Sequence, residues 1–174
     1  TRRSSDLEPE IVVWESPVEP EPEPLLEIAV TPTDDAYLQG GTRFNNQWLK
    51  VEGTNRISYL RFNVTGIDGT VISASLRLRE NGDPGEGVLR AWRGSHNDWT
   101  ETTLTAAKAP AKSVEMGMRQ GAVGTGQEIT IDLGTNIATN GVFTVVLEQD
   151  AGGNDIWFGS KECANPPSLL LVVE

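Results

Sequence analysis

The chain has 174 residues and a formal net charge of −11, from 25 acidic and 14 basic side chains. An acidic surface without a cluster of Lys and Arg repels phosphate groups, so we expect neither nucleic acid nor an anionic membrane as a partner. No stretch approaches the roughly 20 apolar residues that a membrane helix needs. The length suits one folded domain with a substantial core.

Cysteine usage and the first residue bear on where the protein acts. Cys163 is the only cysteine, so no internal disulfide can form, and we expect its thiol to be a small buried apolar group. The chain starts at Thr1 without a methionine, which fits a processed secreted protein. We therefore expect an extracellular or cell-surface location.

The first 26 residues differ in composition from the rest of the chain. Residues 15–25 alternate Glu with Pro, and the fixed φ of proline together with charge repulsion predicts an extended polyproline-II spacer. An isolated apolar run precedes this spacer and consists of Ile11, Val12, Val13 and Trp14. Because a stiff arm holds the run away from a neighbouring strand, we expect it to fold back onto its own domain or to pair with another copy.

From residue 27 onward, apolar and polar residues alternate with period two, which is the pattern of half-buried β-strands. The clearest strands are 59–64 and 71–80, separated by the Gly/Asp turn 66–69. Further strands are predicted at 26–30, 36–38, 48–51, 88–92, 128–133, 142–148, 156–158 and 168–173. About ten short strands indicate an all-β antiparallel sandwich over residues 27–174, with residues 1–26 as an extended arm.

Two connecting segments carry more specific expectations. Residues 102–108 contain Ala and Leu ahead of Pro110, which predicts one short helical piece. Residues 149–155 combine Gly, Asn and Asp, which is typical of a hairpin loop.

Several segments, in order along the chain, resemble those of a known family. They are Asp35-Ala36-Tyr37, 58–62 (SYLRF), 73–80 (SASLRLRE), 98–105 (DWTETTLT) and 158–162 (FGSKE). The resemblance covers about residues 28–174 and is to the DNRLRE-type domain, which is grouped with carbohydrate-binding module family 96. It implies an extracellular jelly-roll sandwich without catalytic activity that binds an acidic polysaccharide such as alginate.

Catalytic patterns are lacking in the sequence. A Ser/His/Asp triad would have to use His96, the only histidine, and residues 94–98 show no nucleophile elbow. The acids alone do not identify a two-carboxylate glycosidase site. We expect that the protein is not an enzyme and has no catalytic residue.

Sugar binding requires exposed aromatic rings and cationic side chains that hold carboxylates. Arg61, Arg77 and Arg79 alternate with apolar residues, which would allow them to share one outward face that binds a ligand. The alternative, which we favour, is that these arginines pair with acids such as Glu52 and Glu80 on a solvated sheet. We expect the tryptophans at 48, 92, 99 and 157 in the core. The candidate sugar-binding residues are Lys50, Arg56, Tyr59, Arg61, Arg77 and Arg79.

A structural calcium ion is the one cofactor that the sequence suggests, because sandwich modules hold this ion with Asp, Asn and backbone oxygens. The spacing of the available oxygens matches no defined calcium loop, so the ligands stay unassigned. The available residues are Asp34, Asp35, Asp98, Asp150, Asn154 and Asp155.

Two functions of different classes follow. In the first, the protein is a subunit of an extracellular fibre or matrix, and Ile11, Val12, Val13 and Trp14 are donated as an extra strand to a neighbouring copy, which yields a polymer. In the second, residues 27–174 bind an acidic polysaccharide and tether a secreted enzyme or a cell to it. Because an apolar run on a stiff arm has no role in a plain linker, we favour the structural subunit.

Overall fold

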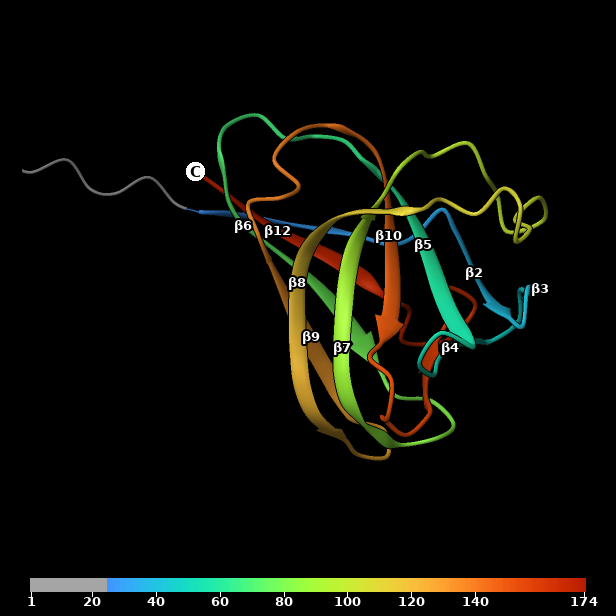
Figure 1. Cartoon of the computed structure of the whole chain (residues 1–174). Coiled ribbons are helices and arrows are strands. Elements are labelled where there is room, and N and C mark those ends of the chain that lie inside the picture. The colour runs from blue at the N-terminus through green and yellow to red at the C-terminus, as the bar shows by residue number, and fades with distance from the viewer. Residues whose placement is uncertain (1–24) are drawn as a thin grey trace, which may run out of the picture.

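The computed structural model describes residues 25–174, and this part of the chain forms strands and no helix (Figure 1). The predicted strand donor, Ile11 to Trp14, lies outside the described residues, as does almost all of the Glu/Pro run. Within residues 25–174 no helix is long and apolar enough to cross a membrane. The strands are β1 (Leu26–Val30), β2 (Asp34–Gln39), β3 (Thr42–Phe44), β4 (Trp48–Val51), β5 (Arg56–Val64), β6 (Val71–Arg79), β7 (Gly85–Gly94), β8 (Lys112–Val123), β9 (Glu128–Gly134), β10 (Gly141–Gln149), β11 (Ile156–Gly159) and β12 (Ser168–Val173).

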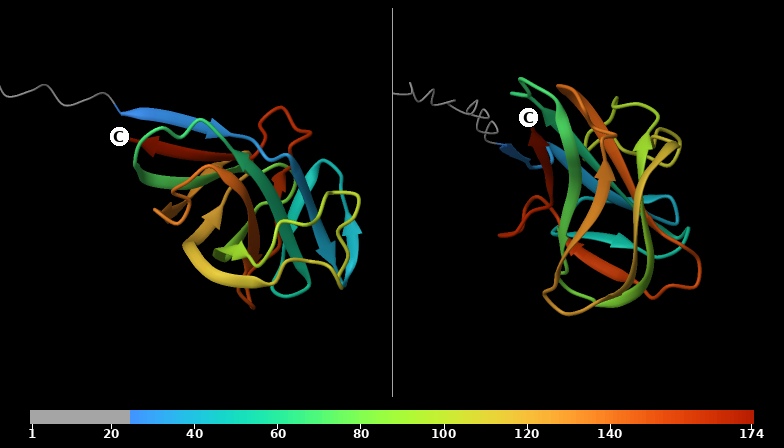
Figure 2. Two further views of the ribbon diagram at one scale, coloured as in Figure 1. Left: turned by 90° about the horizontal axis from the view of Figure 1, so that it is seen from above. Right: turned by 90° about the vertical axis from the view of Figure 1, so that its left-hand side faces the viewer.

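The strands form two large sheets and one small one. The order is β1-β12-β6-β9 in the four-stranded sheet, β3-β2-β5-β10-β7-β8 in the six-stranded sheet and β11-β4 in the small sheet. Every pairing is antiparallel, and the two large sheets face each other (Figure 2). The prediction of an all-β antiparallel sandwich is confirmed.

Period-two patterns place one face of each sheet in a shared core. On β9, the side chains Ile129, Ile131 and Leu133 are buried while the residues between them are exposed. On β5, Leu60 and Phe62 point into the same core from the opposite sheet. Because successive strand residues point to opposite faces, this alternation leaves the other residues of each strand on the outer faces of the sandwich.

A second apolar cluster covers the outer face of the six-stranded sheet. Tyr59 and Val146 on that face pack with Trp99 and Leu104 from the loop between β7 and β8. The predicted helix at 102–108 is wrong, because these residues form turns. Leu104 is fully buried, and the threonines before it bond within their own turn, which competes with helical hydrogen bonding.

Two further expectations also differ from the structure. Residues 149–155 are not a hairpin loop, because they join β10 in the six-stranded sheet to β11 in the small sheet. The strands β3 and β8 were not predicted. The side chains of β8 are mostly exposed on both faces, because β8 is an edge strand of the sheet, so its sequence lacks clear apolar alternation.

Glu80, the acid that ends the SASLRLRE segment, ties two loops together. Its side chain is 3% exposed. Oε1 accepts a hydrogen bond from the backbone N–H of Gly82 at 2.7 Å, and Oε2 accepts one from the N–H of Gly126. The carboxylate therefore links the connection after β6 to the turn between β8 and β9, and it forms no ion pair with an arginine of the described residues.

We expect Glu80→Ala to lower the free energy of unfolding by about 1–3 kcal/mol, because two backbone N–H groups lose a buried acceptor. Urea denaturation monitored by tryptophan fluorescence measures the change. Glu86→Ala is the control, since Glu86 is exposed and its carboxylate makes no hydrogen bond within residues 25–174. Equal stability of the two variants would contradict the role of Glu80.

Candidate carbohydrate-binding site

Two tryptophans and a lysine share the outer face of the small sheet. On β4, Leu49 and Val51 point into the main core, so Trp48 and Lys50 point outward. Trp157 on β11 pairs directly opposite Lys50 in the strand register. We call Trp48, Lys50 and Trp157 the aromatic-lysine site.

The lysine ammonium lies against the aromatic rings. Lys50 Nζ is 3.1 Å from the ring centroid of Trp157, 5.3 Å from that of Trp48 and 5.8 Å from that of Tyr37. The two tryptophan rings are 5.4 Å apart and tilted by 56°. The electron-rich ring faces attract the ammonium, while burial lowers the pKa of Lys50. Among the described residues, no carboxylate lies within 4.0 Å of this ammonium.

Neighbouring groups fix the position of the rings. Asp155 Oδ2 accepts a hydrogen bond from Trp157 Nε1 at 2.5 Å and also binds the guanidinium of Arg56. Arg56 lies 3.4 Å from Glu52 as well, so its charge is already matched. These contacts hold the Trp157 ring in one orientation, which lowers the entropic cost of stacking a ligand on it.

The aromatic-lysine site has the chemistry of a receptor for acidic sugars. Half-buried tryptophan rings offer apolar surface to the C–H face of a pyranose. An ammonium without a carboxylate partner donates hydrogen bonds to a carboxylate or a hydroxyl group. Of the residues predicted from the sequence, Lys50 belongs to this site, and Arg56 lies next to it through Asp155.

The other predicted sugar-binding residues lie elsewhere. Tyr59 is buried under the β7–β8 loop and packs edge to face against Trp99 with ring centroids 6.1 Å apart. Arg61 forms an ion pair at 2.6 Å with Asp34, its partner across β2 and β5. Arg77 and Arg79 belong to β6 in the opposite sheet.

The hypothesis that Arg61, Arg77 and Arg79 share one outward face is therefore wrong. Consecutive strands of a sandwich can enter different sheets, and β5 and β6 do so here. The alternative, pairing with acids on the sheet, holds for Arg61 with Asp34 and for Arg77 with Glu128 at 3.4 Å.

The sequence predicted that the tryptophans at 48, 92, 99 and 157 lie in the core. Of these four, only Trp99 is buried. Trp48 and Trp157 are half-buried on the outer face of the small sheet. The sequence contained a signal for the position of Trp48. If the apolar Leu49 and Val51 point into the core, the alternating residues Trp48 and Lys50 must point outward. The meeting of Trp48 with Trp157 depends on the pairing of two strands more than 100 residues apart in the chain.

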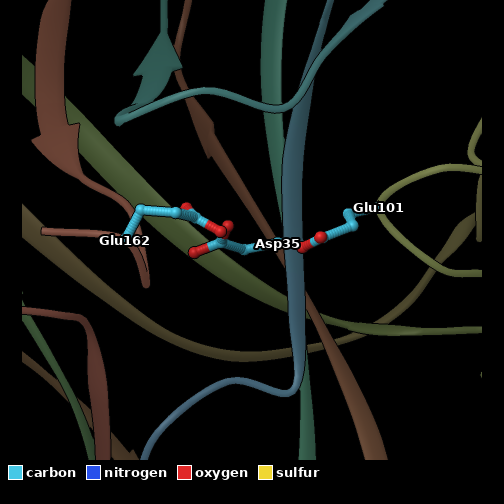
Figure 3. Close-up of side chains that lie close together, drawn as sticks. All are labelled: Asp35, Glu101 and Glu162. Atoms are coloured by element: carbon cyan, nitrogen blue, oxygen red, sulfur yellow. The ribbon is translucent and has the colours of Figure 1, made fainter.

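A separate cluster of acids lies where three family-like segments meet. Asp35 of β2 lies between Glu101 from the β7–β8 loop and Glu162 from the segment after β11 (Figure 3). The carboxylate oxygens lie within 4.8 Å of one another. Lys161 neutralises part of this charge, with Nζ 2.8 Å from Glu101 and 2.5 Å from Glu162, while its backbone N–H donates to Asp35 at 2.7 Å.

The acid cluster does not fit the calcium ion suggested by the sequence. The ammonium of Lys161 already pairs with two of the three acids, and these hydrogen bonds raise its pKa. Burial raises the pKa of Asp35 to about 7, so this carboxyl is only partly ionised at neutral pH. Calcium takes about six to eight oxygen ligands, whereas this cluster brings together three carboxyl groups, two of which already pair with Lys161.

The other residues named for calcium are dispersed in the structure. Within residues 25–174, the one group of acids close enough to share an ion includes only Asp35 of the predicted set. Three other members bind arginine instead: Asp34 with Arg61, Asp150 with Arg90, and Asp155 with Arg56.

Comparison with known proteins agrees with this architecture. The sequence model of carbohydrate-binding module family 96 matches residues 27–173, which is nearly the whole of the described part of the chain. A search of curated proteins found no match. Apart from Leu26 of β1, the matched region contains all strands of the described residues and all three residues of the aromatic-lysine site, and the chain belongs to carbohydrate-binding module family 96.

Proposed function

We propose that the protein is a non-catalytic, extracellular module that binds an acidic polysaccharide at the aromatic-lysine site. Residues 27–174 form the module, with a jelly-roll arrangement of strands, and residues 1–26 form an arm that connects it to its surroundings. Family membership supports carbohydrate binding, and the geometry of Trp48, Lys50 and Trp157 supports the choice of site and the acidic character of the glycan.

The observation that carries this proposal is that Lys50 has no acidic partner among the described residues. A second lysine also lies near an aromatic ring: Lys112, which is exposed, has its Nζ 5.3 Å from the ring of Trp92. Lys112 also pairs with both oxygens of Glu148, at 2.8 and 2.6 Å, whereas Lys50 has no such partner among the described residues. Lys50 is 9% exposed, and a cation held against aromatic rings without an acid partner can pair with a carboxylate that a ligand brings.

Affinity gel electrophoresis with alginate in one gel and a neutral cellulose derivative in another tests this proposal. We expect the wild type to be retarded by alginate, and Lys50→Gln to lose most of this retardation. Lys112→Gln, the matched control, is expected to migrate like the wild type. Absence of retardation by alginate and by other carboxylated polysaccharides would overturn the proposed function, and equal behaviour of the two variants would overturn the assignment of the site.

The structural-subunit hypothesis that the sequence favoured gains no support from these findings. Family 96 is defined by binding to carbohydrate, so membership favours the polysaccharide-binding alternative. The proposed donor strand, Ile11 to Trp14, lies outside the described residues. Self-association therefore has no supporting observation in residues 25–174.

A further inference from the structure

A polar groove of about 320 Å³ adjoins the aromatic-lysine site. It is lined by residues of three segments, among them Gln47, Arg79, Asn81 and Asn165. Gln47 directly precedes Trp48, and the groove residue Asn81 directly precedes Gly82. A Cβ at Gly82 would lie 2.9 Å from the ring of Trp157 and 3.2 Å from Trp48 Nε1, so the loop that forms the groove packs against both tryptophans.

The two acids of the groove are already engaged. Glu80 accepts hydrogen bonds from the N–H groups of Gly82 and Gly126. Glu162 accepts hydrogen bonds from Lys161 and from the hydroxyl of Ser160. Neither carboxylate pairs with the cation of the groove.

That cation is Arg79, which is exposed on the outer face of β6. Within residues 25–174 its guanidinium has no acid within 4.0 Å and no hydrogen-bond partner. Arg77, two residues earlier on the same face of the same strand, differs because it pairs with Glu128. An arginine without a partner presents the planar pair of N–H donors that fits a carboxylate.

Amide side chains complete the lining. Gln47 and Asn165 make no side-chain hydrogen bond to the described residues, and Asn81 uses only its Nδ2, which donates to Cys163 Sγ at 3.1 Å. Each amide offers both a donor and an acceptor, the combination that recognises sugar hydroxyl groups. Cys163, expected to be a buried apolar group, is half-buried and donates in turn to the carbonyl of Gln47 at 3.1 Å.

We propose that this groove is a second sugar subsite, in which Arg79 pairs with the carboxylate of one uronic acid residue while another residue of the same glycan chain occupies the aromatic-lysine site. This inference rests on the proposed function. It predicts that a carboxylate of the glycan pairs with Arg79 and not with Arg77. It also predicts that affinity increases with the length of the glycan.

Isothermal titration calorimetry with oligouronates of increasing length tests the second subsite. We expect the wild type to bind long oligomers more tightly than a disaccharide, because a longer ligand reaches both subsites. Arg79→Gln should weaken binding of the long oligomers about tenfold and leave binding of the disaccharide nearly unchanged. Arg77→Gln should bind all lengths like the wild type.

The outcomes separate this inference from the proposed function. Suppose that the wild type binds oligouronates and that Lys50→Gln lowers the affinity, but that Arg79→Gln binds every length with wild-type affinity. In that case only the second subsite is overturned. If the wild type binds none of them, both proposals fail. Thermal unfolding of each variant, expected to match the wild type because both arginines are on the surface, excludes loss of folding as the cause.

Discussion

Replacing Trp157 with alanine is expected to lower the affinity for a carboxylated polysaccharide at least tenfold. The ring supplies apolar surface for stacking and also holds the ammonium of Lys50, whose Nζ lies 3.1 Å from its centroid. Aromatic anchors of this kind contribute about 2 kcal/mol or more to binding, and 1.4 kcal/mol already corresponds to a factor of ten. Calorimetric titration with an oligouronate measures the change.

The matched control for this prediction is Trp92→Ala. Trp92 is also half-buried and also has a lysine near its ring, but it belongs to β7, in a different sheet. We expect this variant to bind like the wild type. Trp157→Phe should retain an intermediate affinity, because it keeps an aromatic face. A Trp157→Ala variant that stays folded and binds with wild-type affinity would show that the ligand lies elsewhere.

The contribution of Asp35 to the free energy of unfolding is expected to fall as the pH rises from about 4 to 7. Burial raises the pKa of this carboxyl from 3.8 to about 7 in the folded chain. Between these values the folded state keeps a proton that the unfolded state has lost, so raising the pH favours unfolding. At 1.36 kcal/mol per pKa unit, the full effect above pH 7 is at most about 4 kcal/mol.

Asp35→Asn isolates this contribution from those of its neighbours. Glu162 works in the opposite direction: although its burial acts against ionisation, hydrogen bonds from Lys161 and Ser160 leave its pKa lowered. The variant keeps an oxygen for the N–H of Lys161 but cannot ionise. Relative to the wild type, its free energy of unfolding should therefore be higher at pH 8 than at pH 5, as measured by urea denaturation. A pH-independent difference would rule out titration of Asp35 in the folded state.

The acid cluster and the aromatic-lysine site have different roles in this interpretation. Asp35, Glu101 and Glu162 come from three of the segments that carried the family resemblance, yet Lys161 satisfies much of their charge. The cluster joins β2, the β7–β8 loop and the segment after β11, so it stabilises the framework. In the aromatic-lysine site, by contrast, the cation has no carboxylate partner among the described residues.

The sequence alone determined the fold class and the family. Alternation with period two is a local property of each strand, so it identified most strands and the residues that fill the core. It also placed Arg61, Arg77 and Arg79 on the outward faces of their strands, opposite the core residues beside them. Strands without this alternation, such as β8 at the edge, gave no signal, because neither of their faces needs to be apolar.

The tertiary structure alone decided which of those side chains meet. The assignment of β5 and β6 to different sheets separated Arg61 from Arg79, and the pairing of β4 with β11 brought Lys50 to Trp157. Partners for charged groups were decided in the same way, since Arg77 has Glu128 while Arg79 has none among the described residues. The physical reason is that strand pairing across a sandwich depends on contacts between distant segments, which no local pattern encodes.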